Sequence, residues 1–151
     1  MTDTLVYLTE YEVKDLQIYN LLDKAINHEM NYFRRNSTYS IWIRKESRKI
    51  EFSIAFLNED DAKYFETGYC GYFRYRENLF FIYLDIKNNI NLNKFFRKRD
   101  SKTPFQFRYE PIFLYTRAEE TGWLYFYKRG KFIYNHLFDI RIENGGENNF
   151  P

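Results

Sequence analysis

The chain has 151 residues, a length typical of one domain, and a domain of this size buries about 70% of its chain surface without needing disulfides or metals. Its 23 basic and 21 acidic side chains give a net charge of +2, which argues against a dedicated, strongly basic nucleic-acid-binding protein. Cys70 is the single cysteine, which excludes a disulfide framework and a metal site of several cysteines.

Aromatic residues are the unusual part of the composition: 15 Tyr, 16 Phe and 2 Trp. Aromatic side chains favour strands, and each can bury about 150–250 Å². We therefore expect a sheet whose core is built from rings. A core of this size does not need so many rings, so we also expect some of them at the surface.

The start of the chain, Met1 to Thr4, lacks the basic and apolar stretches of a signal peptide. No apolar run approaches the roughly 20 residues of a membrane-spanning helix. These features lead us to expect a cytoplasmic protein. Asn, Lys, Ile, Phe and Tyr are abundant while Pro and Ala are scarce, which suggests an AT-rich bacterial or phage genome.

An apolar run at 4–8 predicts a first strand, and the strongest helical pattern of the chain follows it. Apolar side chains recur at spacings of three and four, with polar residues mostly on the other side. We expect a long amphipathic helix from about Val13 to Arg34. Its apolar face would consist of Leu16, Tyr19, Leu22, Ile26, Met30 and Phe33.

Several hairpins are expected after this helix. Alternation with period two predicts a hairpin over 38–57 with a polar turn at 46–48, and a second hairpin with arms at 69–75 and 79–86. Acidic residues after Asn58 predict the start of a short helix. One or two helical turns are expected at 91–96, followed by a solvated loop at 97–102.

Further strands are predicted at 105–109, 112–115, 124–127 and 132–134, with an edge strand at 138–142. The tight turn at 128–131 contains Gly130, which can take positive φ. Together the elements predict an α+β fold: a curved antiparallel sheet of about six to eight strands, one long N-terminal amphipathic helix packed on it, and one or two short helices. One domain is expected over 1–143, with a flexible C-terminal tail over 144–151.

The residues that usually carry chemistry are sparse. His28 and His136 have no ligand partner at helical spacing, and Cys70 lies in a predicted strand, where a free cysteine behaves as a small apolar residue. No glycine-rich phosphate loop and no G-x-S-x-G motif occurs. We therefore expect no catalytic residue, no metal and no cofactor, and a role other than that of an enzyme.

One enzymatic alternative remains, a metal-dependent nuclease. Asp85 and Lys87 end a predicted strand two residues apart, an arrangement in which the acid can hold a cation and the Lys can stabilise charge on a phosphate. Glu51, Asp60 or Asp61 would supply the second carboxylate. Such spacing is common by chance, so this alternative requires the three groups to lie within a few ångströms of one another.

Nucleic-acid binding is a second alternative, because basic residues cluster at 94–108 and again at 128–131, with aromatic residues close to both. Cations would contact phosphates while rings stack on bases. The aromatic motif of RNA-recognition modules is absent, since Thr67 stands where such a motif needs a basic residue before Gly68. The candidate residues are Lys94, Arg97, Lys98, Arg99, Lys102, Arg108, Lys128, Arg129 and Lys131.

Protein binding is the function that we favour, because Tyr and Arg are common interface anchors and an inhibitor needs only a complementary surface. The expected partner is another protein, such as a toxin or an enzyme, which this chain would neutralise as a small bacterial or phage inhibitor of the immunity-protein type. The acidic stretches at 59–61 and 119–120 would suit a basic partner. The candidate binding residues are Tyr72, Arg74, Tyr75, Arg76, Tyr125 and Tyr127.

Overall fold

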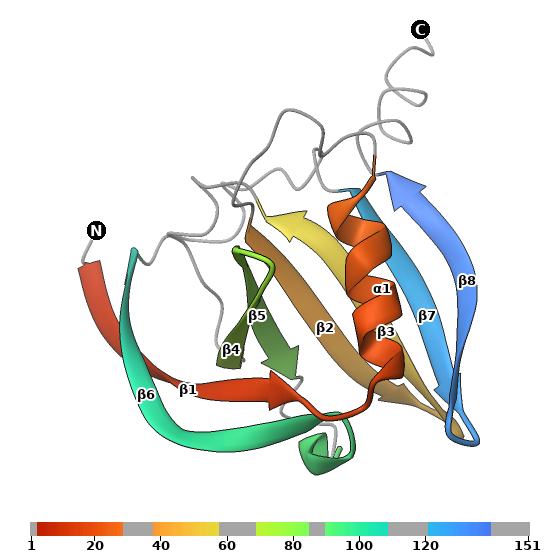
Figure 1. The fold of residues 1–151 in the computed structure, drawn as a ribbon, viewed down its shortest axis with the longest axis horizontal. Coiled ribbons are helices and arrows are strands. Elements are labelled where there is room, and N and C mark those ends of the chain that lie inside the picture. The colour runs from red at the N-terminus through yellow and green to blue at the C-terminus, as the bar shows by residue number, and fades with distance from the viewer. Residues whose placement is uncertain (1–2, 29–37, 58–68, 85–89, 109–120, 140–151) are drawn as a thin grey trace, which may run out of the picture.

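The computed structural model describes residues 3–28, 38–57, 69–84, 90–108 and 121–139. Within these ranges, eight strands form one mixed sheet in the order β6-β1-β4-β5-β2-β3-β7-β8, and one helix lies against a face of the sheet (Figure 1). The elements are β1 (Asp3–Val13), α1 (Gln17–Ile26), β2 (Thr38–Glu46), β3 (Lys49–Leu57), β4 (Tyr69–Tyr75), β5 (Asn78–Leu84), the 3-10 turn η2 (Leu92–Lys94), β6 (Phe96–Arg108), β7 (Thr121–Lys128) and β8 (Lys131–Asp139).

The predicted α+β fold with a long N-terminal helix is wrong, because the described part of the chain is mostly strand and α1 has only ten residues. Val13, where the predicted helix begins, is the last residue of β1, and the helix itself begins only at Gln17. Tyr11 and Val13 alternate in the strand and pair with Lys98 and Phe96 of β6. The last part of the predicted helix, residues 29–34, lies outside the described ranges.

The apolar face of α1 also differs from the predicted one. Ile18, Leu21, Leu22 and Ala25 are buried against the sheet, at the spacing of three and four that a helix face requires. Leu16, which was placed on that face, precedes the helix and is 73% exposed. The true stripe of α1 therefore starts at Ile18, and Leu16 belongs to the connection that leads into the helix.

The sheet is mixed, so the expectation of an entirely antiparallel sheet is wrong, although most neighbouring strands do pair antiparallel. The three hairpins β2–β3, β4–β5 and β7–β8 are antiparallel, as predicted, but β1 pairs in parallel with β4 and β2 in parallel with β5. The reason is topological: the β4–β5 hairpin lies between β1 and β2. No local feature of the sequence signals such an insertion.

The predicted solvated loop at 97–102 is wrong as well, because these residues form the first half of the outer strand β6. Their side chains are exposed, which is why their polarity resembled that of a loop. Arg97 donates to a Glu12 carboxylate oxygen at 3.0 Å, and the Ser101 hydroxyl donates to Glu10 at 2.7 Å. Contacts with β1 therefore hold this polar stretch in the sheet.

The other sequence predictions have mixed outcomes. The helical turn expected at 91–96 is the short η2, and the strand expected at 105–109 is the second half of β6. The strands expected at 132–134 and 138–142 are parts of one strand, β8, which ends at Asp139. The short helix after Asn58, the strand at 112–115 and the tail at 144–151 lie outside the described residues.

Aromatic rings fill the space between α1 and the sheet, as the composition predicted. Phe73 and Phe80 stack with 5.0 Å between ring centroids, and Tyr39 stacks on Phe80 at 4.6 Å. A smaller cluster is formed by Leu8, Tyr72 and Phe81, with Phe105 of β6 packed against it. The rings thus hold the hairpins and the outer strand in one sheet.

Candidate functional site

The tyrosines that were predicted to bind a partner lie largely in the core. Tyr72 is 3% exposed and Tyr125 is 1% exposed, so their rings are not available to a partner. Tyr127 is half-buried and packs edge-to-face on Phe95, with 4.8 Å between centroids. Of the side chains in that prediction, Arg74 and Arg76 are the exposed ones.

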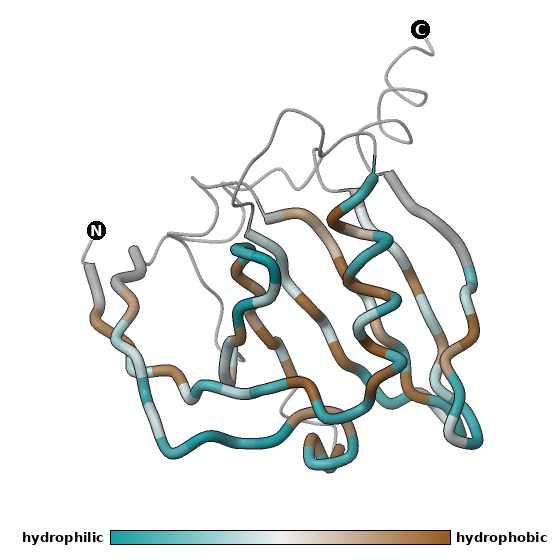
Figure 2. Tube along the Cα trace, in the orientation of Figure 1, coloured by the Kyte–Doolittle hydropathy of each residue, from teal (hydrophilic) through white to brown (hydrophobic). Residues whose placement is uncertain are grey.

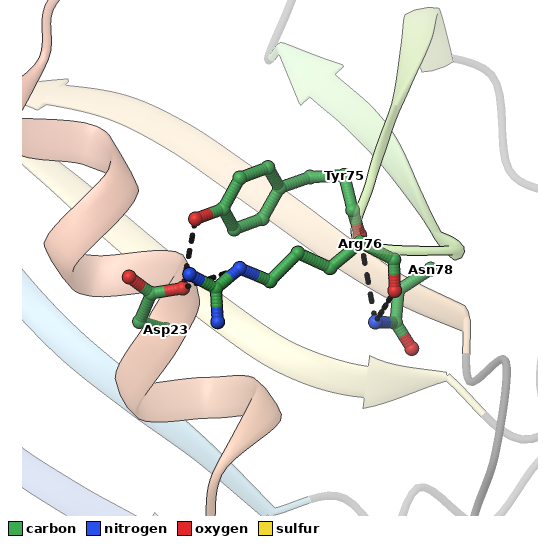
Figure 3. Close-up of polar contacts among 4 residues, drawn as sticks. All are labelled: Asp23, Tyr75, Arg76 and Asn78. Carbon is green, nitrogen blue, oxygen red and sulfur yellow. Dashed lines mark hydrogen bonds and ion pairs between the residues drawn. The ribbon is translucent and has the colours of Figure 1, made fainter.

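Tyr75 and Arg76 have a structural partner in α1 (Figure 3). The Tyr75 hydroxyl donates to Asp23 Oδ1 at 2.8 Å, and the Arg76 Nε lies 3.5 Å from the same oxygen. The Asn78 amide donates to the backbone carbonyl of Arg76 at 2.8 Å. These contacts fasten the β4–β5 turn to the helix, so the turn has a role in the fold.

The residues predicted to bind nucleic acid fall into separate parts of the sheet. Arg97, Lys98, Arg99 and Lys102 lie on β6, which is the first strand of the sheet order, whereas the turn at 128–131 joins β7 to β8, the last strand. The β6 residues of the first segment are therefore far from the second segment in the strand order. Lys94 is different, because it precedes Phe95, whose ring contacts Tyr127 and Phe132 next to the second segment. The side chain of Arg108 is not among those described.

The turn at 128–131 gains basic neighbours that the sequence analysis missed. Because β3 pairs with β7, with Ile50 opposite Tyr127, the β2–β3 turn lies beside the β7–β8 turn. This neighbour contributes Lys45, Arg48 and Lys49. The Lys49 Nζ lies 3.9 Å from the centroid of the Phe126 ring, which is a cation–π contact.

The entry to α1 and the turn η2 meet the same end of the sheet. The Gln17 side chain donates to the Gly130 carbonyl at 2.9 Å and accepts from the Phe132 N–H at 3.3 Å, so it holds the β7–β8 turn against the helix. The Lys14 ammonium donates to the Asn93 carbonyl at 3.0 Å. The Phe95 ring packs against the Phe132 ring with 6.0 Å between their centroids.

We call this region the basic end. Its members share a place at the ends of β2, β3, β7 and β8 or beside the start of α1, and they are Lys14, Lys45, Arg48, Lys49, Lys94, Lys128, Arg129 and Lys131. Asp15 and Glu46 are the acidic residues in the same segments. The segments that hold these eight basic residues contain two acidic ones, although the whole chain has a net charge of only +2. Figure 2 shows the tip of the β7–β8 turn as hydrophilic.

The β7–β8 turn is unfavourable for stability in two ways. Lys128 and Lys131 stand directly opposite each other, and like charges in such a pair destabilise a hairpin. Arg129 has a φ of 53°, a left-handed conformation that Asn or Gly adopts more easily. Within the described residues, none of these three side chains has a hydrogen bond or an ion pair.

Two large apolar side chains lie next to this turn on β8. Ile133 is 53% exposed and Tyr134 is 45% exposed. Tyr134 contacts the edge of Tyr125 at 5.5 Å between centroids, and Ile133 is opposite Phe126 in the register of the hairpin. Because neighbouring residues of a strand point to opposite faces, Tyr134 lies on the face that α1 covers and Ile133 lies on the other face, with Lys131. The exposed cations of the β7–β8 turn together with Ile133 make the best candidate surface for recognition.

The groups with catalytic potential are engaged in packing. Burial raises the pKa of the Cys70 thiol to about 11, and its Sγ donates to the Ile82 carbonyl at 3.6 Å, so it stays protonated near neutrality. The His28 ring packs edge-on against Trp123 with 5.0 Å between centroids. Among the described residues, no three or more His, Cys, Asp or Glu side chains are grouped to hold a metal.

The nuclease alternative falls mainly on residues that the structure does not describe. Asp85, Lys87, Asp60 and Asp61 all lie outside the described ranges, as does the side chain of His136. Glu51 is described, and its carboxylate forms an ion pair with Arg44 at 2.7 Å. The geometry of the proposed acid pair is therefore untested.

No known family model, curated protein or solved structure matches the chain. In the ranges that are described, there is no helix both long and apolar enough to cross a membrane. A function can therefore be proposed only from the residues of this chain and their geometry.

Proposed function

We propose that this chain is a protein-binding domain that engages an acidic surface of another protein through the β7–β8 hairpin and the basic end around it. The supporting observation is the turn itself: Lys128, Arg129 and Lys131 lower local stability and gain no partner within the described part of the chain. Natural proteins retain such unfavourable choices mainly at functional sites.

The surroundings of the turn favour a protein over a nucleic acid. Protein interfaces combine apolar contact with a charged rim, and the exposed Ile133, two residues after Lys131 on the same face of β8, fits that pattern. Base stacking would need rings with open faces. Of the nearby rings, Phe132 and Tyr127 are half-buried and pack against each other with 4.8 Å between centroids. Phe126 has Lys49 over its face, and the exposed Tyr134 has the Lys24 ammonium 5.7 Å from its ring centroid.

The partner in this proposal is a toxin or enzyme that the chain neutralises, as the sequence led us to expect. Blocking an enzyme requires a rigid surface complementary to it and no chemistry. The Gln17 hydrogen bonds, which fix the backbone of the β7–β8 turn, supply that rigidity. Electrostatic complementarity to an acidic face would raise the association rate and select against other partners.

The test compares two doubly charge-reversed variants. Lys128→Glu with Lys131→Glu changes the turn and keeps a like-charged pair, so the hairpin register is unchanged. The matched control, Lys98→Glu with Lys102→Glu, makes the same charge change on exposed positions of β6. Wild type and both variants would be used to capture partners from nuclease-treated and untreated native lysate, with quantification by mass spectrometry.

We expect wild type to capture one protein in stoichiometric amount, whether or not the lysate is treated with nuclease. The captured amount should fall roughly tenfold or more with the turn variant and should stay the same with the control variant. The acidity of the captured protein is the second readout. Recovery of nucleic acid, or equal loss of the protein in both variants, would contradict the proposal. In the first case the nucleic-acid alternative would take its place.

A further inference from the structure

A second candidate site lies where β1 and β4 separate. The two strands pair in parallel at only two positions, Thr9 with Gly71 and Glu10 with Tyr72. Beyond them β1 follows β6, while β4 follows β5 into the turn at Arg76. Figure 1 shows β1 running on towards the start of α1. The ladder between β1 and β4 is therefore split after its second pair.

A cleft of about 260 Å³ opens at this split. It is lined by residues of β1, α1, β4 and β6, and these are Glu10, Tyr11, Glu12, Val13, Tyr19, Phe73, Arg74, Tyr75 and Arg99. Drug-sized ligands occupy about 300–1,000 Å³. The volume of this cleft therefore suits a molecule with a single ring.

Part of the cleft wall is aromatic. Tyr19 and Tyr75 contact each other with 5.0 Å between ring centroids, and Phe73 is almost fully buried behind them. The Tyr11 ring lies directly on Gly71, where an added Cβ would overlap its edge atoms. The absence of a side chain at Gly71 thus gives the Tyr11 ring its place against β4, and Tyr11, Tyr19, Phe73 and Tyr75 form the aromatic part of a mixed polar and apolar lining.

The charged side chains on the rim of the cleft differ in whether they already have a hydrogen-bond partner. The Glu12 carboxylate accepts from Arg97 at 3.0 Å, and Glu10 accepts from Ser101 at 2.7 Å. Arg74 and Arg99 are exposed and have no hydrogen bond or ion pair within the described residues. The Glu12 charge is thus paired with Arg97 and Glu10 is hydrogen-bonded to a neutral hydroxyl, so the two guanidinium groups of the lining outnumber its one carboxylate without an ion pair.

We propose that this cleft binds a small planar molecule bearing a carboxylate or phosphate, its ring against Tyr19 and Tyr75 and its anion held by Arg74 and Arg99. The guanidinium group matches the geometry of both anions and can donate two parallel hydrogen bonds to either. The aromatic lining selects for a ring over a bare anion. This site is separate from the basic end and does not depend on the protein-binding proposal.

The test is titration of the full chain with phenyl phosphate and, separately, with benzoate, followed by isothermal calorimetry and by ¹H–¹⁵N spectra. Inorganic phosphate lacks the ring and benzyl alcohol lacks the charge, so each removes one half of the proposed recognition. The double variant Arg74→Gln with Arg99→Gln removes the cations. Its control, Arg48→Gln with Arg129→Gln, removes two exposed guanidiniums at the basic end.

We expect saturable binding of phenyl phosphate or benzoate, with shifts centred on residues 10–13 and 73–75. Binding should weaken roughly tenfold or more for inorganic phosphate, for benzyl alcohol and in the Arg74/Arg99 variant, and should be unchanged in the control. The stronger of the two aromatic anions identifies the anionic group. No saturation by either one below about 10 mM, or equal binding by the Arg74/Arg99 variant, would overturn the proposal.

Discussion

Two hairpin turns of this chain place an arginine in the same left-handed conformation, with φ of 49° at Arg76 and 53° at Arg129. Both turns have two central residues with positive φ, which is the geometry that matches the twist of a β-hairpin. At the β4–β5 turn the arginine side chain reaches Asp23 of α1. At the β7–β8 turn the arginine side chain has no such contact within the described residues.

The contacts of the two arginines differ in a way that assigns a stabilising role in the fold to the β4–β5 turn. The unfavourable backbone of Arg76 is offset by its ion pair and by its position over the Tyr75 ring, 5.4 Å from the centroid. Around Arg129 the backbone is held by Gln17 and the side chains are left exposed. A strained, fixed backbone that presents cations without partners in the described residues is the feature on which the proposed recognition role of this turn rests.

The first prediction compares equivalent positions, since Asn78 and Lys131 each follow the two central residues of their turn. The buried Asn78 amide donates to the carbonyls of Arg76 and Tyr75. Asn78→Ala should lower the free energy of unfolding by about 1–3 kcal/mol, because those carbonyls lose their donor. Lys131→Ala removes an exposed cation and should change it by less than about 0.5 kcal/mol.

Urea denaturation of both variants, monitored by far-UV circular dichroism, measures this difference. A loss at Lys131→Ala as large as at Asn78→Ala would mean that the β7–β8 turn also serves the fold, and the comparison would fail.

The second prediction concerns one tyrosine hydroxyl in each hairpin. Tyr75→Phe removes the hydrogen bond to Asp23 and should lower the free energy of unfolding by about 1 kcal/mol. The buried Tyr125 hydroxyl has no hydrogen-bond partner in the described part of the chain. Tyr125→Phe should therefore leave stability unchanged or raise it by about 1 kcal/mol. Thermal and urea unfolding of the two variants, side by side, provide the measurement.

Alkaline pH gives an independent check on Tyr125. Burial, with a smaller contribution from Tyr134, raises the pKa of its hydroxyl from 10.0 to about 12. The folded state holds this proton more tightly than the unfolded state does. The resulting contribution of Tyr125 to the free energy of unfolding is therefore full below pH 10 and is lost as the pH rises towards 12. Tyr125→Phe should flatten that part of the pH profile. An unchanged profile would show that the hydroxyl is solvated in the folded protein.

The local elements could largely be predicted from the sequence, but their arrangement could not. Alternation of apolar residues gave the three hairpins, including both turns compared here. The insertion of β4–β5 between β1 and β2 depends on contacts between distant segments, which no local pattern carries. The predicted helix began too early because Val13 pairs with Phe96 of β6, a tertiary contact that overrides the helical spacing.

The candidate site shows the same limit. Clustering along the chain identified Lys128, Arg129 and Lys131, but Arg48 and Lys49 joined them only through the pairing of β3 with β7. The tyrosine candidates were misplaced for a related reason. Alternation tells which residues share a face of a strand, and it does not tell whether another layer covers that face, as α1 covers the face that includes Tyr125.

The smallest expected effect is also the sharpest test of the comparison. Arg129→Asn places a residue that tolerates the left-handed conformation at the first central position of the β7–β8 turn, so stability should rise by up to about 1 kcal/mol. Arg76→Asn gains the same backbone relief but loses the ion pair with Asp23, so it should bring no net gain.

The affinity for the protein partner should change in the opposite direction to the stability. Arg129→Asn should weaken it, because a cation is lost from the recognition surface, while Arg76→Asn should leave it unchanged. Unfolding curves together with the affinity for the captured partner give both quantities for each variant. If Arg129→Asn becomes more stable and still binds as tightly as wild type, then Arg129 is not a recognition residue. The binding surface would then have to be sought in the lysines of the basic end.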